Sequence, residues 1–320
     1  MTPQIRLRPL KDSDRAEHAD LLYSSFNSWY WRHGWGRNYF GAPPQEMGLL
    51  YDVYNDLTPG RSVAAFDKQT GRMMGACFFH PRENHVSLGV MSVHPNYGGQ
   101  GVGRLLVKHI LDFTKKGGYS ACRLVGSALN MDSFSLYNRA GFVPRVTYQT
   151  MVLSAPPPGK APKAPKAPKV SRAKEGVREA TQRDVAAMGE LEIELSGIRR
   201  EIDYRYAISN PRGVFHATVY ENDQRGIDGF MISVKSPALN MLGPCVARTE
   251  EVAVALVLRG LERFQGTWGA LLVVPTDKRR MVEQMYAVKA INVETHLLQV
   301  WGDFPGFKGV SMPSFLPETG

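Results

Sequence analysis

Residues 94–106 read HPNYGGQGVGRLL, with glycine at positions 98, 99, 101 and 103. Two regular patterns flank these glycines. Residues 86–93 alternate apolar side chains with smaller ones, which predicts a strand. Residues 104–114 carry apolar side chains at helical spacing, which predicts a helix. The glycines are therefore expected at a turn that leads from a strand into a helix.

A turn of this kind suits a phosphate group. Glycines leave backbone N–H groups uncovered, and the first turn of a helix adds unpaired donors and a positive dipole end. The alternative is a glycine-rich turn without a ligand, because glycine is the usual turn residue. Two other phosphate signatures are excluded: no lysine follows these glycines as in GxxxxGK[ST], and the GxGxxG spacing is absent.

The spacing within this turn resembles motif A of the GCN5-related N-acetyltransferases (GNAT). In that motif a strand ending in Val-x-Pro leads into Arg/Gln-x-x-Gly-x-Gly/Ala and a helix. The matching residues are Val93, Pro95, Gly101 and Gly103. Gly98 stands where the family usually has Arg or Gln, so one side chain is missing. The backbone donors survive this change, because every residue except proline carries an N–H.

A second motif of the same family follows downstream, with the pattern Asn-x-x-Ala-x-x-Leu/Phe-Tyr-x-x-x-Gly-Phe. Here it is formed by Asn130, Ser133 in place of Ala, Leu136, Tyr137, Gly141 and Phe142. Independently of the family, residues 122–125 indicate a buried strand and residues 130–139 a short helix that ends before Gly141. A tyrosine near a helix C-terminus often serves only packing, but beside a phosphate loop it becomes a candidate for catalysis.

The resemblance implies a mixed α/β fold, acetyl-CoA as the acetyl donor, and direct transfer of the acetyl group to a primary amine. It implies that Tyr137 protonates the leaving thiolate and that the backbone of Ser92 or Val93 supplies an oxyanion donor. The implied coenzyme-binding residues are Met91, Ser92, Val93, Gly98, Gly99, Gln100, Gly101, Val102, Gly103, Arg104, Asn130, Ser133 and Tyr137.

The general base is not evident in the sequence. Many members of the family carry a Glu on the central strands, but residues 86–93 contain none. His80, Glu83 and His85 lie at the edge of this strand, and of these we favour His85 or Glu83. The alternatives are a surface or packing role for the histidine, or a chain of water molecules as the base.

An acceptor wall is suggested by residues 29–40, WYWRHGWGRNYF, which contain seven aromatic side chains when His33 is included. Packing of a helix against the sheet is one explanation of such a segment. Because glycine and arginine interrupt the pattern, a shaped loop is the other explanation. We therefore take Trp29, Trp31 and Trp35 as candidate residues for stacking against an amine.

The chain of 320 residues is long enough for two domains. Residues 154–174 are rich in Pro, Ala and Lys, which indicates an extended linker. We expect an acetyl-CoA-binding and catalytic domain at 1–153, a linker at 154–176 and a second GNAT-like domain at 177–320. Residues 154–174 carry six of the 39 basic residues and no acidic residue, so they account for much of the net charge of +9.

The two halves resemble each other. Residues 7–14 correspond to residues 177–184, and residues 136–142 to residues 285–291. The second half contains strand candidates at 215–220, 229–234 and 270–274 and an apolar helix at 252–264. Residues 242–249 stand in place of the phosphate loop without a run of exposed N–H groups, so we expect this half to be a degenerate copy without a coenzyme site.

The remaining features restrict the class of protein. Cys77, Cys122 and Cys245 are odd in number and far apart, so we expect neither disulfides nor a metal site. The absence of a leader or an apolar segment predicts a cytoplasmic protein without a membrane partner. The acceptor is expected to be a small molecule or peptide amine. A non-catalytic acyl-CoA-binding or regulatory module is the rival, and nucleic-acid binding by the linker a third possibility.

Overall fold

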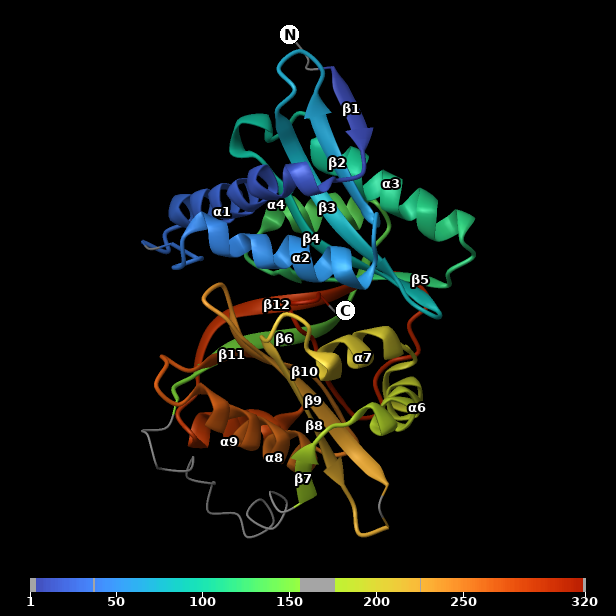
Figure 1. Cartoon of the computed structure of the whole chain (residues 1–320), viewed down its shortest axis with the longest axis vertical. Coiled ribbons are helices and arrows are strands. Elements are labelled where there is room, and N and C mark those ends of the chain that lie inside the picture. The colour runs from blue at the N-terminus through green and yellow to red at the C-terminus, as the bar shows by residue number, and fades with distance from the viewer. Residues whose placement is uncertain (1–3, 37, 156–175, 225, 319–320) are drawn as a thin grey trace.

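The computed structural model describes residues 4–36, 38–155, 176–224 and 226–318. The linker expected at 154–176 lies almost wholly outside these ranges. We call residues 5–153 the N-terminal half and residues 177–318 the C-terminal half, the upper and lower parts of Figure 1. The elements of the N-terminal half are β1 (Ile5–Arg8), α1 (Arg15–Arg32), α2 (Gly48–Leu57), β2 (Ser62–Asp67), β3 (Met73–Pro81), β4 (His85–Val93), α3 (Val102–Lys116), β5 (Ala121–Ser127), α4 (Met131–Arg139) and β6 (Val143–Leu153).

The C-terminal half repeats this order of elements. It contains β7 (Val177–Glu179), α6 (Val185–Ser196), α7 (Glu201–Ser209), β8 (Phe215–Glu221), β9 (Ile227–Lys235), β10 (Asn240–Ala247), α8 (Glu250–Leu261), β11 (Ala270–Pro275), α9 (Arg279–Ala287), β12 (Ile291–Gly302) and β13 (Val310–Met312). The strands and helices expected around the glycine turn, around Tyr137 and in the second half all form. Within the described residues, no helix has the combination of length and apolar character needed to cross a membrane.

The start of each half confirms the internal repeat. Arg8 forms a bidentate salt bridge with Asp14, and Arg178 forms the same salt bridge with Asp184. Each aspartate also accepts a hydrogen bond from the backbone N–H three residues earlier, at 2.8 Å in the first half and 2.7 Å in the second. This carboxylate satisfies a donor that the following helix would otherwise leave unpaired. The same local solution therefore begins both halves.

The strands form one mixed sheet that runs through both halves. Within the described residues it has thirteen strands in the order β1-β2-β3-β4-β5-β12-β6-β11-β10-β9-β8-β7, and β13 pairs with β10. The pairs β4–β5 and β10–β11 are parallel, and the other pairs are antiparallel. This arrangement is a mixed α/β fold, as the sequence predicted.

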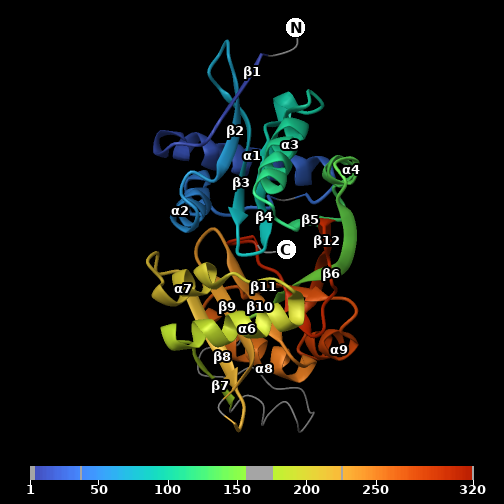
Figure 2. The same ribbon diagram turned by 90° about the vertical axis from the view of Figure 1, so that its right-hand side faces the viewer.

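The halves exchange their last long strands at the centre of the sheet. Strand β12 of the C-terminal half pairs with β5 of the N-terminal half, from His296 opposite Ser127 to Gly302 opposite Ala121. Strand β6 in turn leaves its own half and pairs with β11. Figure 2 shows β6 curving down from α4 into the lower part of the molecule. Backbone hydrogen bonds therefore join the halves, and β12 brings its side chains to β5.

The end of β12 approaches β5 so closely that residue 302 has no room for a side chain. Gly302 has a φ of 89°, and a Cβ atom added there would lie 2.1 Å from the carbonyl oxygen of Ser120. We expect Gly302→Ala to lower the free energy of unfolding by about 2–4 kcal/mol, because strain and overpacking add. Urea denaturation measures this loss. Gly118→Ala is the matched control, since Gly118 has a φ of 70° and nothing within 4 Å of an added Cβ. Equal losses for the two variants would contradict the close approach.

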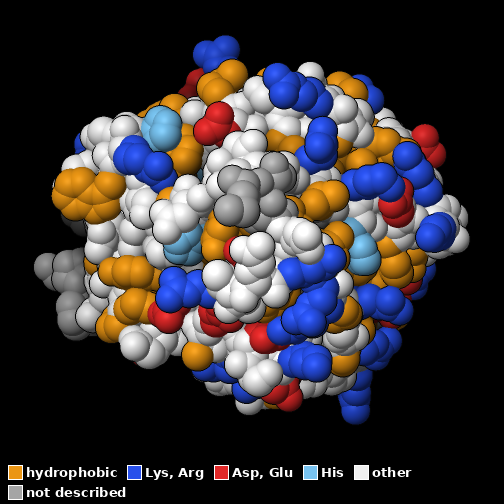
Figure 3. Space-filling model, turned by 90° about the horizontal axis from the view of Figure 1, so that it is seen from above, with side chains coloured by type: hydrophobic (Ala, Val, Ile, Leu, Met, Phe, Trp, Pro, Cys, Tyr) orange, Lys and Arg blue, Asp and Glu red, His pale blue; other side chains and the backbone are white. Residues whose placement is uncertain are grey.

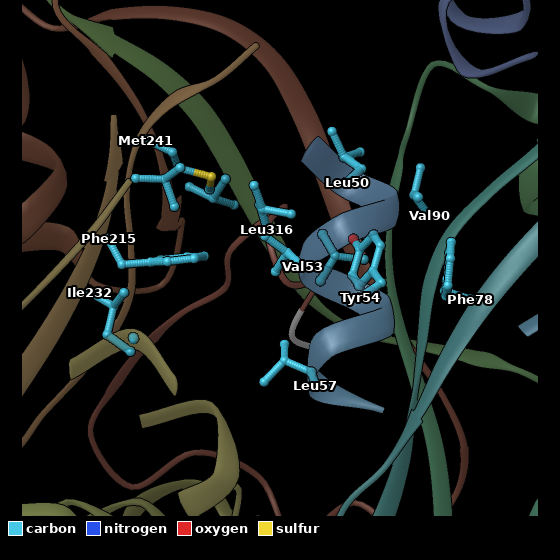
Figure 4. Close-up of a cluster of buried hydrophobic side chains, with 14 of the residues drawn as sticks. Leu50, Val53, Tyr54, Leu57, Phe78, Val90, Phe215, Ile232, Met241 and Leu316 are labelled. Carbon is cyan, nitrogen blue, oxygen red and sulfur yellow. The ribbon is translucent and has the colours of Figure 1, made fainter. Parts of the chain in front are cut away.

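A hydrophobic core lies between the halves and includes side chains from both. Helix α2 contributes Leu50, Val53, Tyr54 and Leu57, all buried. Figure 4 shows this helix between side chains of the N-terminal half, such as Phe78, and side chains of the C-terminal half, such as Phe215. Because one face of α2 packs on each half, neither half could bury this helix alone. This shared core thus helps to fix the position of one half relative to the other.

Candidate active site

The site begins where β4 and β5 separate. These parallel strands pair only from His85 to Ser87 on β4 and from Ala121 to Arg123 on β5. Beyond this point the strands diverge, and residues 88–93 and 124–127 line a cleft of about 2870 Å³. Ligand pockets usually have volumes of about 300–1,000 Å³. This cleft is large enough for a coenzyme and a second ligand together.

The glycine turn lies at one end of the cleft. Gly101 precedes α3 with a φ of 83°, a conformation that favours glycine. The helix begins at Val102, so the N–H groups of its first turn are available to a ligand. Every residue predicted to contact the pyrophosphate lines the cleft, as does the rest of the predicted coenzyme set: Met91, Ser92, Val93, Gly98, Gly99, Gln100, Gly101, Val102, Gly103, Arg104, Asn130, Ser133 and Tyr137.

Basic side chains line the cleft. Arg104, Lys108, Lys115 and Arg139 belong to its lining. Figure 3 shows the molecule from above, and Lys and Arg side chains outnumber acidic ones on this face. A phosphate-bearing ligand would gain from this positive field as well as from the helix terminus.

Strand β4 offers a free backbone edge to the cleft. Met91, Ser92 and Val93 pair with β3 on one side, while on the other side β5 has already diverged. A β-bulge precedes them, because Gly89 and Val90 together lie opposite the single residue Phe78. Unpaired strand edges of this kind bind extended chains through their N–H and C=O groups. The edge therefore suits the amide-bearing arm of a coenzyme.

Tyr137 lies on α4 and faces the cleft, with 7% of its surface exposed. Burial raises the pKa of this phenol well above its usual value, so it is protonated at neutral pH and can donate a proton. The side chain of Asn130 accepts a hydrogen bond from the N–H of Ser133 at 3.0 Å, which caps the start of α4. Asn130 thereby orients the helix that carries Tyr137.

The two candidate bases lie outside the cleft, which corrects the expectation for His85 and Glu83. Glu83 is exposed in the turn between β3 and β4. His85 is buried and contacts Asn84 and Ser87. Burial, together with the nearby Arg123, holds the pKa of this imidazole well below its usual value. Neither residue is among those that line the cleft, so neither can reach a ligand there.

Only some of the side chains in the aromatic segment 29–40 line the cleft. Trp29 and Trp35 line the cleft, so these two are in position to contact a ligand. Trp31 does not line it: 53% of its surface is exposed, and its indole donates a hydrogen bond to Asn38 at 2.7 Å. The cleft wall also includes Tyr30 and Tyr39, whose rings stack with centroids 4.3 Å apart. The helical phase of α1, which turns Trp31 outward, explains this correction.

Three polar residues that the sequence analysis missed line the same cleft: Glu294, His296 and Glu318. Glu294 and His296 lie on the exchanged strand β12, and Glu318 follows β13. Glu294 accepts hydrogen bonds from the Tyr30 hydroxyl at 2.9 Å and from the Ser127 hydroxyl. Burial lowers the pKa of His296 to about 4, so this ring is neutral at neutral pH. No local sequence signal marks these residues, because only the strand exchange brings them here.

The corresponding gap in the C-terminal half is filled. Strands β10 and β11 pair only at Met241 and Leu242 before they diverge. Beyond that point β13 pairs with β10, with Cys245 opposite Met312. Helix α8 begins with Glu250 and Glu251, whose charges oppose the binding of an anion at a helix N-terminus. The chain itself therefore occupies the place that the N-terminal half leaves open.

Residues 29–142 match the model of the acetyltransferase (GNAT) family. These residues form a domain of the GNAT family. No curated protein matches it in sequence. Solved structures match it across both halves, and one of them is described as a tandem GNAT protein from the clavulanic acid biosynthesis pathway. That protein is 15% identical, with a TM-score of 0.59 over 93% of this chain and 98% of that one. The two halves are thus a tandem arrangement of GNAT folds.

Two other structures share the fold over nearly the whole chain. A putative acetyltransferase from Pyrococcus horikoshii has a TM-score of 0.74 at 15% identity, and the match covers 98% of this chain and 95% of that one. A GCN5-related N-acetyltransferase from Sphaerobacter thermophilus has a TM-score of 0.62 at 17% identity, covering 95% and 97%. These identities are too low to transfer an acceptor. Family membership indicates an acyltransferase, and the N-acetyltransferases are the class to which the family model points.

Proposed function

We propose that the chain transfers an acetyl group from acetyl-CoA directly to a primary amine, in the cleft of the N-terminal half. The observation that carries this proposal is the open gap between β4 and β5, with the glycine turn at one end and Tyr137 beside it. The C-terminal half, whose own gap is filled by β13, would shape the acceptor side instead of binding a second coenzyme.

Each requirement of the reaction has a candidate in this cleft. The N–H groups at the start of α3 and the basic side chains around them would hold the phosphates. The free edge of β4 would align the pantetheine arm, and a backbone N–H of Ser92 or Val93 would stabilise the oxyanion. Tyr137 would protonate the leaving sulfur. Bound acetyl-CoA supplies the activated thioester, and the chain's part is to hold it, orient the amine and move protons.

The test is release of free CoA thiol from acetyl-CoA in the presence of single amines: straight-chain monoamines and diamines, aminoglycosides and peptides with a free N-terminus. We expect release with at least one of these amines and acetylation of that amine by mass spectrometry. The rival is a regulatory module that binds acyl-CoA without reacting. It would bind CoA in calorimetry but release no thiol with any amine.

A substitution of Gly98 that tightens CoA binding can test where the pyrophosphate lies. Its φ of −57° and ψ of 142° suit any residue, and the nearest atom to an added Cβ is the Pro95 carbonyl oxygen at 3.5 Å. We expect Gly98→Arg to tighten CoA binding about 3–10-fold, because a guanidinium can donate charge-assisted hydrogen bonds to phosphate. Gly98→Glu is the matched control and should weaken binding. Isothermal titration with CoA measures both, and equal affinities for the two variants would place the phosphates elsewhere.

A further inference from the structure

Two carboxyl groups line the cleft, one buried and one partly buried, and both come from the C-terminal half. Glu294 is 5% exposed on β12. Glu318 lies in the segment after β13, and its Oε2 atom is buried without a hydrogen-bond partner. Both residues line the cleft. A buried carboxylate without a cation is costly to maintain, so a pair of them in one cleft points to a positively charged ligand.

The C-terminal segment is tied to α2, and this holds Glu318 in the wall of the cleft. The backbone N–H of Glu318 donates a hydrogen bond to the Tyr54 hydroxyl at 3.3 Å, and that hydroxyl donates to the carbonyl of Phe315, also at 3.3 Å. Burial is the main cause that raises the pKa of Tyr137 and of Tyr54, and the charge of Glu318 adds to it. Glu318 and the phenol that we assign to the leaving group line the same cleft.

Glu294 is held by other elements than Glu318. Tyr30 and Ser127 hold its carboxylate from two elements of the N-terminal half, α1 and β5. These donors leave lone pairs free on the oxygens. Tyr30 in turn stacks on the ring of Tyr39, which also lines the cleft. Burial is the main influence on the pKa of both Glu294 and Glu318, and it raises each value. A bound ammonium group opposes this rise, because a nearby positive charge favours the ionised carboxylate.

We propose that the acceptor is an amine with two cationic nitrogens, of which Glu318 deprotonates the reacting one and Glu294 binds the other. This inference rests on the proposed function and names the acceptor class for the same site. It also gives the C-terminal half a direct part in the reaction, because both carboxylates come from that half.

The proton and bond changes balance as follows. Glu318 takes one proton from the reacting ammonium group, which frees the nitrogen lone pair. The nitrogen then forms a bond to the acetyl carbon while the bond from that carbon to sulfur breaks. Tyr137 gives its proton to the sulfur and regains one from the new amide nitrogen. The proton on Glu318 passes to water, so one proton is released for each acetyl group transferred.

The test compares three probes of matched chain length: a straight-chain diamine, the monoamine, and the ω-amino acid whose second group is an anion. Release of CoA thiol is followed for the wild type, Glu294→Gln and Glu318→Gln. Glu190→Gln serves as control, since Glu190 lies exposed on α6. Titration with CoA checks that each variant still folds and binds the donor. Several diamine lengths are used, each with its own monoamine and amino acid.

We expect the wild type to use the best diamine with a kcat/KM at least tenfold above that of its monoamine, and to use the amino acid least. Glu294→Gln should abolish this preference, so that its kcat/KM for the diamine falls to that for the monoamine. Glu318→Gln should lower kcat about 100-fold with both amines and leave CoA affinity unchanged. Glu190→Gln should behave as the wild type.

Each unexpected outcome of this experiment would overturn a different part of the proposal. Equal use of diamines and monoamines by the wild type would overturn the acceptor class while leaving acetyl transfer intact. A preserved diamine preference in Glu294→Gln, or an unchanged kcat in Glu318→Gln, would overturn the role of that residue. If the wild type binds CoA but releases no thiol with any of these amines or with those tested for the proposed function, the proposed function itself fails, and this inference fails with it.

Discussion

Tyr137→Phe is expected to lower kcat by about 100- to 10,000-fold, which is the usual contribution of a positioned general acid, and to leave CoA affinity unchanged. The phenol is buried on α4 and faces the cleft, and its raised pKa keeps the proton available at neutral pH. The substitution removes only the hydroxyl. The ring can keep its edge-to-face contact with Phe142, whose centroid lies 5.9 Å away.

Steady-state kinetics with the best amine measure kcat, and titration with CoA measures the affinity for the coenzyme. Tyr119→Phe is a suitable control, because Tyr119 lies after α3 and does not line the cleft. A change in CoA affinity without a change in kcat would mean that the hydroxyl of Tyr137 binds the donor instead of protonating the thiolate. An unchanged kcat in a variant that binds CoA normally would remove Tyr137 from the mechanism.

Arg82→Met is expected to lower the free energy of unfolding by about 3–5 kcal/mol, as is usual when one member of a buried ion pair is removed. Arg82 lies between β3 and β4, and its partner Asp203 lies on α7 of the other half, with a closest N–O distance of 2.8 Å. Both side chains are almost inaccessible, with 0% and 3% of their surfaces exposed. The substitution leaves the carboxylate buried without its cation, and burial already raises the pKa of Asp203.

Two further variants show whether the loss of stability comes from the buried charge of Asp203. The free energy of unfolding of every variant is measured by urea denaturation. The double variant Arg82→Met with Asp203→Leu should regain much of the loss, because no isolated charge remains. Arg279→Met breaks an exposed pair with Glu283 and should cost about 0.5 kcal/mol or less. A loss for Arg82→Met no larger than that of Arg279→Met would show that this contact does not hold the halves together.

The coenzyme side of the cleft could be predicted from the sequence because its determinants are local. The glycine turn needs only a strand, Gly101 in a left-handed conformation and a helix, all within residues 86–114. The helix that carries Tyr137 begins at the cap that Asn130 provides. Hydrophobic periodicity and capping residues act over a few positions. They determine these elements whatever the rest of the chain does.

The residues on the acceptor side of the cleft could not be predicted from the sequence, because their positions depend on which strands pair across the whole chain. Strands that follow one another in sequence are usually neighbours in a sheet, which would place β6 beside β5. The structure places β12 there instead, and it thereby brings Glu294 to Ser127 and Tyr30 across more than 160 residues. The segment after β13 brings Glu318 to Tyr54 in the same way.

By itself, then, the sequence determined the GNAT domain at residues 29–142, the mixed α/β class and the strand, turn and helix at the glycine end of the cleft. The tertiary structure alone decided that His85 and Glu83 lie outside the cleft, that Glu294 and Glu318 of the other half line it, and that β13 closes the second gap. The physical reason is that strand partners are selected by the burial and hydrogen bonding of the complete sheet. No window of neighbouring residues contains that information.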